Sequence, residues 1–407
     1  MTMRDAGVIV VGAGVAGLAA AQRLAAAGVS VRLLEAADRI GGRAWTTCPA
    51  LLGGAPFDVG ATWLHAARRN PLVALATAED GLTDSDAVRR ERVYVDGRVA
   101  TAAEAATYER AWGQLETVVA PALAGPDRTL AAAMAPMADD PWAGTVALWE
   151  GAIIAAADAD ALGLQDWHRN ALEGPNLLPA AGVGAFVAHR LAAPVELGTP
   201  VTGIDWGGAG VRVETERGTL LAGAVIVTVS TGVLASGAIR FSPALPPAVE
   251  GAIHRLPMGL LTKVALAAPE RFGFPADMLL VERDRPMTFN AWPLARPYVT
   301  GFVGGRTAWS LAEDEAGLIE LARDELARLL PRRLTAGAVV SRWGSDELHR
   351  GAYAFAGPGD ADQRGVLAAA FPGERLIFAG EACRMDGLAG TVGGAYLSGI
   401  EAAERLL

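Results

Sequence analysis

The sequence predicts an α/β chain in which a doubly wound parallel sheet is interrupted by an α+β domain, a mixed sheet flanked by helices. Three observations support this. Residues 8–11 form a short apolar run, followed by a glycine-rich turn and an Ala-rich stretch that suits a helix. Strand-like segments return at 201–229 and 375–381. The segments between these blocks have different sequence patterns, so one domain is expected to be split by another.

The glycine turn has the spacing of a dinucleotide cradle. Gly12 permits a tight turn, Gly14 lets backbone N–H groups approach a pyrophosphate, and Gly17 lets the helix pack close to the sheet. Glu35 ends the next strand, 29–34, near the roughly 20-residue spacing of a carboxylate that binds ribose hydroxyls. The strand, turn, helix and acid together distinguish this motif from an incidental turn in a chain with 49 glycines.

Length, charge and cysteine content narrow the class of protein. A chain of 407 residues is expected to form two or three domains, at about 150 residues each. A net charge of -10 argues against nucleic acid and anionic membranes as partners and favours solubility. Two cysteines are too few for a disulfide framework, and with scattered histidines they give no metal site. Residues 1–5 lead directly into the first strand and no apolar stretch is long enough to span a membrane, so a cytoplasmic protein is expected.

The remaining elements follow in order along the chain. Helical periodicity dominates residues 70–165, and an amphipathic helix is expected at 313–330. The predicted strands are 201–206, 211–216, 220–229, 260–266, 287–292, 298–303 and 375–381, before a closing helix at 391–407. This order predicts a cofactor domain of residues 1–75, 186–256 and 342–407, and a substrate domain of residues 76–185 and 257–341.

Further motifs carry a resemblance to a known family. Gly41-Gly42-Arg43 resembles the second half of the FAD fingerprint of glutathione-reductase-type flavoproteins, and residues 57–65, Phe-Asp-Val-Gly-Ala-Thr-Trp-Leu-His, are a further match. With the segments at 199–204, 227–234, 258–264, 342–346, 378–381 and 391–396, these motifs resemble the flavin amine oxidases. That family includes monoamine oxidases, polyamine oxidases and lysine-specific histone demethylases. The matching segments span nearly the whole chain.

The resemblance implies a glutathione-reductase-type Rossmann domain that binds FAD, with the α+β substrate domain inserted into it. It also implies which residues bind the FAD. Arg43 can neutralise a pyrophosphate or brace the flavin edge. Ala352 stands where monoamine oxidases attach their flavin through a cysteine, so the FAD is expected to be noncovalent. The expected cofactor-binding residues are Gly12, Gly14, Gly17, Glu35, Gly42, Arg43, Gly60, Ala61, Thr62, Val201, Trp343, Gly380, Glu381, Thr391 and Val392.

The resemblance also implies the catalytic residues. Lys263 matches the family lysine that binds a water at flavin N5, and Tyr353 matches one wall of an aromatic cage. The second wall falls on Thr391, where monoamine oxidases have an aromatic residue and polyamine oxidases often have threonine. His65 is expected at the substrate funnel. Three of these residues also have a purely structural explanation. Lys263 could extend its side chain to solvent, Tyr353 could pack in an ordinary core, and His65 could be a structural histidine.

These expectations define a function. The flavin takes a hydride from the carbon of a C–N bond in a primary, secondary or polyamine substrate, water hydrolyses the imine, and dioxygen reoxidises the flavin to give hydrogen peroxide. Alternatives are an L-amino-acid oxidase, an FAD-dependent C–C desaturase and a noncatalytic FAD-binding module. The first requires an arginine to clamp a carboxylate, for which Arg68, Arg69 and Arg296 are candidates. The expected partners are a small amine and dioxygen, and a homodimer stays open.

Overall fold

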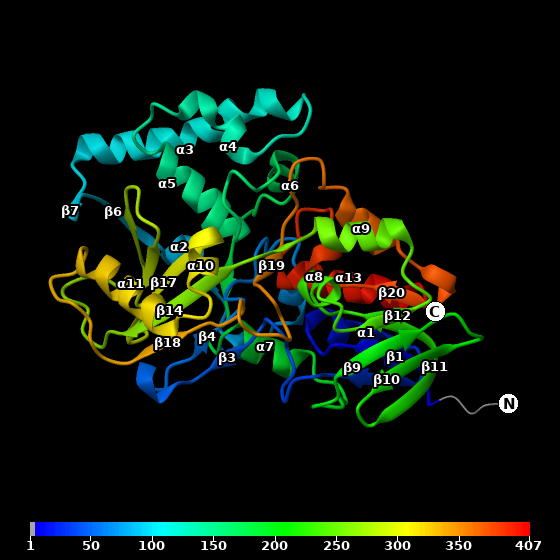
Figure 1. Cartoon of the computed structure of the whole chain (residues 1–407). Helices are drawn as coiled ribbons and strands as arrows, with labels where there is room; N and C mark the ends of the chain where they lie inside the picture. Colours follow the sequence, from blue (N-terminus) through cyan, green and yellow to red (C-terminus); the bar gives the residue numbers. More distant parts are fainter. Residues whose placement is uncertain (1–4) are drawn as a thin grey trace.

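Two large sheets organise the chain in a computed structural model that describes residues 5–407. In the first, four strands run parallel in the order β2, β1, β11 and β20. Figure 1 shows this sheet in the lower right, with α1 and α13 side by side against it. The bounds are β1 Ala6–Val11, β2 Val31–Leu34, β11 Gly218–Val227, β20 Leu376–Phe378, α1 Val15–Ala26 and α13 Val392–Glu404.

Both faces of this parallel sheet are buried, as such sheets require. Val8, Val10 and Ile226 point to the side of α1 and α13, whereas Ile9 and Val225 point to the side of α9 (Pro247–Arg255) and α12 (Gln363–Ala369). An antiparallel extension, β9 Val201–Asp205 and β10 Val211–Thr215, pairs with the first half of β11, and β12 Arg240–Ser242 pairs with β9.

The second sheet has the order β18-β14-β17-β16-β15-β6-β7 and is antiparallel except between β15 and β6. Helix α11 packs on one face, and α3, α5 and the π-helix η5 lie over the other (Figure 1). The bounds are β6 Arg90–Val95, β7 Arg98–Val99, β14 Leu261–Ala267, β15 Met278–Glu282, β16 Thr288–Ala291, β17 Tyr298–Gly304, β18 Ala338–Val340, α3 Ala102–Leu123, α5 Ala143–Leu148, η5 Trp149–Ala155, α10 Gly305–Ser310 and α11 Glu315–Ala327.

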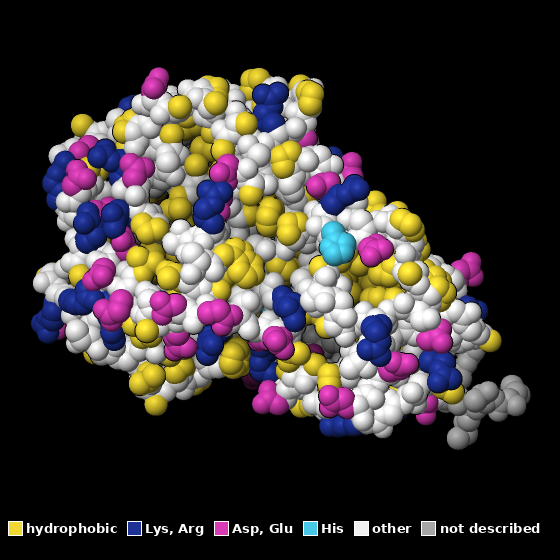
Figure 2. Space-filling view, viewed as in Figure 1, with side chains coloured by type: hydrophobic (Ala, Val, Ile, Leu, Met, Phe, Trp, Pro, Cys, Tyr) yellow, Lys and Arg dark blue, Asp and Glu magenta, His cyan; other side chains and the backbone are white. Residues whose placement is uncertain are grey.

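Short elements complete the chain. They are β3 Thr46–Thr47, β4 Phe57–Asp58, β5 Thr83–Asp84, β8 Leu177–Leu178, β13 Met258–Gly259, β19 Tyr353–Ala354, α2 Ser85–Val88, α4 Leu130–Ala133, α6 Leu164–Arg169, α7 Val183–Arg190 and α8 Thr231–Ala235. No helix of residues 5–407 is long and apolar enough to cross a membrane. On the face shown in Figure 2, acidic and basic side chains are interspersed rather than gathered by sign.

The helical assignment of residues 70–165 was wrong at residues 83–84, which form strand β5, and at residues 90–99. The hairpin β6–β7 lies inside this range and joins the edge of the second sheet. Its turn residues Asp96 and Gly97 have φ values of 52° and 77°, the left-handed conformation that a two-residue Asp-Gly turn requires. The Asp-Gly dipeptide is the sequence signal that could have predicted this hairpin. Strands β12, β15 and β18 were also not predicted. The predicted domain boundaries stay a prediction, although strands of the second sheet come only from residues 90–99 and 261–340 of the described chain.

Candidate active site

The N-terminus of α1 forms the cradle that the glycines predicted. Gly14 is the N-cap and no side chain caps the helix, so the first backbone N–H groups are free to bind a ligand. A Cβ on Gly17 would lie 1.8 Å from the carbonyl oxygen of Gly12, so Gly17 sets the helix against the turn. A Cβ on Gly14 would meet no atom of residues 5–407 within 4 Å. The open side of Gly14 leaves room for a pyrophosphate.

Arg43 and Glu381 form the second half of the cradle. Arg43 Nη1 donates to Glu381 Oε1 at 2.8 Å and to the carbonyl oxygen of Ala352 at 2.8 Å. Glu381 is 6% exposed, and within the described residues its Oε2 atom has no hydrogen-bond partner. A buried carboxylate oxygen without a partner is costly. The hydroxyl groups of a bound dinucleotide would satisfy it, so the residues fit such a cofactor.

We predict that Gly14→Val and Gly17→Ala separate cofactor binding from folding. Gly14 has φ -71°, which any residue adopts, so the apoprotein of Gly14→Val should keep its unfolding free energy within about 0.5 kcal/mol. The valine should nevertheless block the flavin, which is measured as the absorbance retained after gel filtration. Gly17→Ala should instead lower the melting temperature of the apoprotein. Full flavin retention by Gly14→Val would contradict the assignment of the cradle.

Lys263 lies in β14 with its side chain buried at 6% exposure. Its Nζ atom donates to the carbonyl oxygens of Asp58 and Gly60 and to Thr62 Oγ1. Burial lowers the pKa of Lys263 to about 8, while the charge of Asp58 opposes that shift. Below pH 8 the Lys263 ammonium group therefore has three N–H donors for these three acceptors. Lys263 thus fixes the 58–62 loop, which contributes Gly60, Ala61 and Thr62 to the cavity.

Tyr353 lies on β19, between the two sheets in Figure 1. One edge of β19 pairs with β13, and side chains bind the other edge. Arg43 and Glu381 bind the oxygen of Ala352 and the N–H of Ala354. The buried pair Arg364–Asp166 binds the oxygen of Ala354 and the N–H of Ala356, at 2.9 and 2.8 Å. Two ion pairs thus act as a neighbouring strand for the segment that carries Tyr353.

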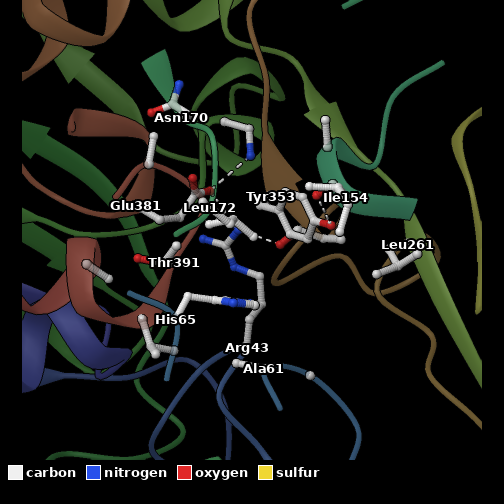
Figure 3. A pocket seen from close by; sticks show the side chains of 18 of the residues that line it. Arg43, Ala61, His65, Ile154, Asn170, Leu172, Leu261, Tyr353, Glu381 and Thr391 are labelled. Atoms are coloured by element: carbon white, nitrogen blue, oxygen red, sulfur yellow. Dashed lines mark hydrogen bonds and ion pairs between the residues drawn. The ribbon is translucent and has the colours of Figure 1, made fainter. Parts of the chain in front are cut away.

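The Tyr353 hydroxyl reaches across the cavity. It donates to the carbonyl oxygen of Ile154 at 2.8 Å, in the π-helix η5, as Figure 3 shows. Gly390 packs against its ring, because a Cβ there would lie 3.5 Å from Tyr353 Cδ2. Thr391, the neighbour of Gly390, uses its hydroxyl to cap α13, accepting from the N–H of Gly394 at 3.0 Å. Thr391 therefore bounds the cavity but presents no aromatic wall opposite Tyr353.

His65 is the end of a hydrogen-bonded chain. The Asn176 side chain donates to Asp86 Oδ2 at 3.0 Å, and its Oδ1 atom lies 2.8 Å from His65 Nδ1. Since a carboxylate only accepts, the Asn176 amide nitrogen must face Asp86, which makes His65 Nδ1 the protonated nitrogen. Burial lowers the pKa of His65, so the ring is neutral at pH 7 with Nε2 free to accept a proton.

One cavity of about 2000 Å³ joins these groups. Glu35, Val201 and the glycine turn line one part, and Lys263, Trp343 and Tyr353 line another. Glu35 accepts from the backbone N–H of Ala13 at 2.6 Å, and Trp343 donates to the oxygen of Val59 at 3.1 Å. All of the predicted site residues line this cavity except Gly17, which acts through packing. The lining residues that sequence reasoning missed include Asn176, Arg364, Thr288 and Asn290.

The comparisons assign this architecture to a class of flavoprotein oxidoreductases. The family model described as flavin containing amine oxidoreductase matches residues 15–124 and 122–407. Polyamine oxidase 4 of Oryza sativa subsp. japonica is 31% identical, over 98% of this chain and 88% of that protein. Lysine-specific histone demethylase 1 homolog 1 of Arabidopsis thaliana is 30% identical, over 98% of this chain and 52% of that protein. A solved structure of a putrescine oxidase redesigned in cofactor binding has a TM-score of 0.80 at 21% identity and covers 98% of each chain.

The chain therefore belongs to the flavin-containing amine oxidoreductase family. It is a flavin-dependent amine oxidase. The predicted fold class and family resemblance are confirmed.

Proposed function

We propose that the protein binds FAD noncovalently and oxidises the C–N bond of a small amine, with dioxygen as the final electron acceptor. The observation that carries this proposal is one continuous cavity that connects the α1 cradle with Lys263, Tyr353 and His65. The bound flavin would supply the chemistry by accepting a hydride, which is two electrons and one proton, from the carbon of the neutral amine. The protonated imine that remains would then be hydrolysed by water.

The residues around the reacting end have separate roles in this proposal. Tyr353 and Phe302 confine the substrate, and the neutral His65 accepts a proton from its ammonium group, because only an uncharged amine has a free lone pair to form the imine. The hydrogen bonds through Asn176 to Asp86 fix the orientation of the His65 ring, and His65 lines the cavity. Noncovalent binding is supported by Ala352, which has no nucleophile. It is also supported by Cys383, whose pKa burial raises to about 12.

An amino acid substrate is less well supported. Of the three arginines considered for a carboxylate clamp, only Arg69 lines the cavity. Its guanidinium group donates to the carbonyl oxygen of Asp386 at 2.8 Å and pairs with Glu173 at 3.4 Å. Arg296 binds the carbonyl oxygen of Ala180 instead. The polar residues Thr288, Asn290 and Glu150 also line the cavity, which does not suit a desaturase of purely apolar substrates.

Two measurements test the proposal together. Denaturing the purified protein should release its flavin, and chromatography should identify that flavin as FAD. Oxygen uptake should then accompany peroxide and aldehyde formation with simple aliphatic amines, and not with L-amino acids. Flavin that stays attached to the denatured chain would contradict noncovalent binding, and uptake with L-amino acids alone would replace the amine assignment.

A further inference from the structure

The cavity is lined by a buried hydroxyl group that forms no hydrogen bond with any described residue. Thr288, in β16, is 3% exposed and lines the cavity. Its Oγ1 atom has no hydrogen-bond partner within residues 5–407. Leaving a buried hydroxyl unpaired costs free energy, so a bound group is expected to pair with it. Asn290, two residues along the same strand and hence on the same face, also lines the cavity.

The register of the second sheet fixes where this hydroxyl lies relative to Lys263. Lys263 in β14 pairs with Phe302 in β17, and Phe302 pairs with Thr288 in β16. These three residues form one row across the sheet. With strands about 4.8 Å apart, Thr288 lies about 10 Å from Lys263, measured between backbones.

The surface between the two ends of this row is apolar. The ring of Phe302 lies between them, with its centroid 5.9 Å from Lys263 Nζ and 6.1 Å from the ring of Trp63. An aliphatic chain can lie on these two rings without losing a polar partner. The row therefore offers a reacting end, an apolar middle and a hydrogen-bonding far end.

We propose that Thr288 and Asn290 form a second binding subsite, which selects aliphatic amines whose far end carries a hydrogen-bond donor, either an ammonium or a hydroxyl group. This inference rests on the proposed amine oxidation. A site with a buried hydrogen-bonding group discriminates against a substrate that lacks the partner, because the protein group is then left unpaired. A monoamine of equal length fills the same space but leaves Thr288 Oγ1 unsatisfied.

The test compares three substrates of equal length in the flavin-loaded enzyme: an α,ω-diamine, the matching amino alcohol and the matching monoalkylamine. The wild-type enzyme should favour the first two in kcat/KM. Thr288→Val keeps the shape and removes the hydroxyl, so this preference should fall about tenfold. Thr288→Ser should retain it. The preference should persist in Thr262→Val, a control whose buried side chain lies on the opposite face of the sheet.

Each outcome decides a different point. Loss of preference for the diamine alone, or for the amino alcohol alone, identifies which donor the subsite binds. A preference unchanged in Thr288→Val, while all three amines still reduce the flavin, would overturn the subsite and leave the proposed function standing. If Thr288→Val does not fold, Asn290→Leu gives the same comparison at the second residue of the pair. Failure of all amines to reduce the wild-type flavin would instead overturn the proposed function.

Discussion

Lys263→Met should slow flavin reduction or reoxidation by about 100-fold or more while the protein still binds flavin. The buried amine is removed from the part of the cavity that also holds Trp343 and Tyr353, and a methionine of similar length cannot donate a hydrogen bond. Stopped-flow absorbance of each half-reaction measures the effect. Unchanged rates in both half-reactions would remove Lys263 from the mechanism.

The pKa of Lys263 predicts how the rate of flavin reduction changes with pH. Burial lowers the pKa of Lys263 to about 8, so the side chain is cationic below pH 8 and neutral above it. Only the neutral form of Lys263 has a lone pair that can accept a proton during the reaction, and a methionine supplies no such base. The rate of flavin reduction should therefore rise with pH through about 8 in the wild-type enzyme. This inflection should be absent from Lys263→Met, whereas changes due to the substrate's own ionisation persist.

Arg364→Met should destabilise the protein by about 3–5 kcal/mol. Arg364 and Asp166 are among the most buried charged residues, with side chains 2% and 4% exposed. Two N–H groups of Arg364 donate to the Asp166 carboxylate at 2.7 and 2.9 Å. Removing one partner leaves a buried charge unpaired. Denaturant unfolding of the flavin-free protein measures the loss.

A matched pair of controls isolates the unpaired charge. The double variant Arg364→Met/Asp166→Leu removes both charges and should recover much of the lost stability. Arg240→Met breaks a pair with Glu214 in which both side chains are exposed, at 71% and 47%, so its effect should be smaller. Equal losses for the single and double Arg364 variants would show that packing, and not the unpaired Asp166, determines the effect.

The sequence predicted the parts of the fold that rest on local patterns. The glycine turn, the strands 201–206 and 298–303 and the closing helix lie within a few residues of their observed bounds, because each has its own periodicity or turn signal. Strand β15 and the hairpin β6–β7 were missed. Their pairing joins residues near 90 to residues near 280, and no local pattern reports a contact of that range.

The same reason explains the site residues that were missed. Arg364 binds Asp166 across nearly 200 residues, and Asn176 reaches Asp86 across 90. Neither pair is visible as a motif. Thr288 has an ordinary strand sequence, and only the cavity reveals that its hydroxyl has no partner among the described residues. Of the acidic residues Glu79, Asp80, Asp84 and Asp86, only Asp86 lines the cavity. Asp80 pairs with Arg190, and Asp84 caps α2.

Anaerobic mixing of the flavin-loaded protein with aliphatic amines tests the central claim most directly. The flavin absorbance near its visible maximum should disappear on mixing and return when oxygen is admitted, with hydrogen peroxide formed in proportion. Flavin that stays oxidised with every amine in the panel would contradict amine oxidation at this cavity.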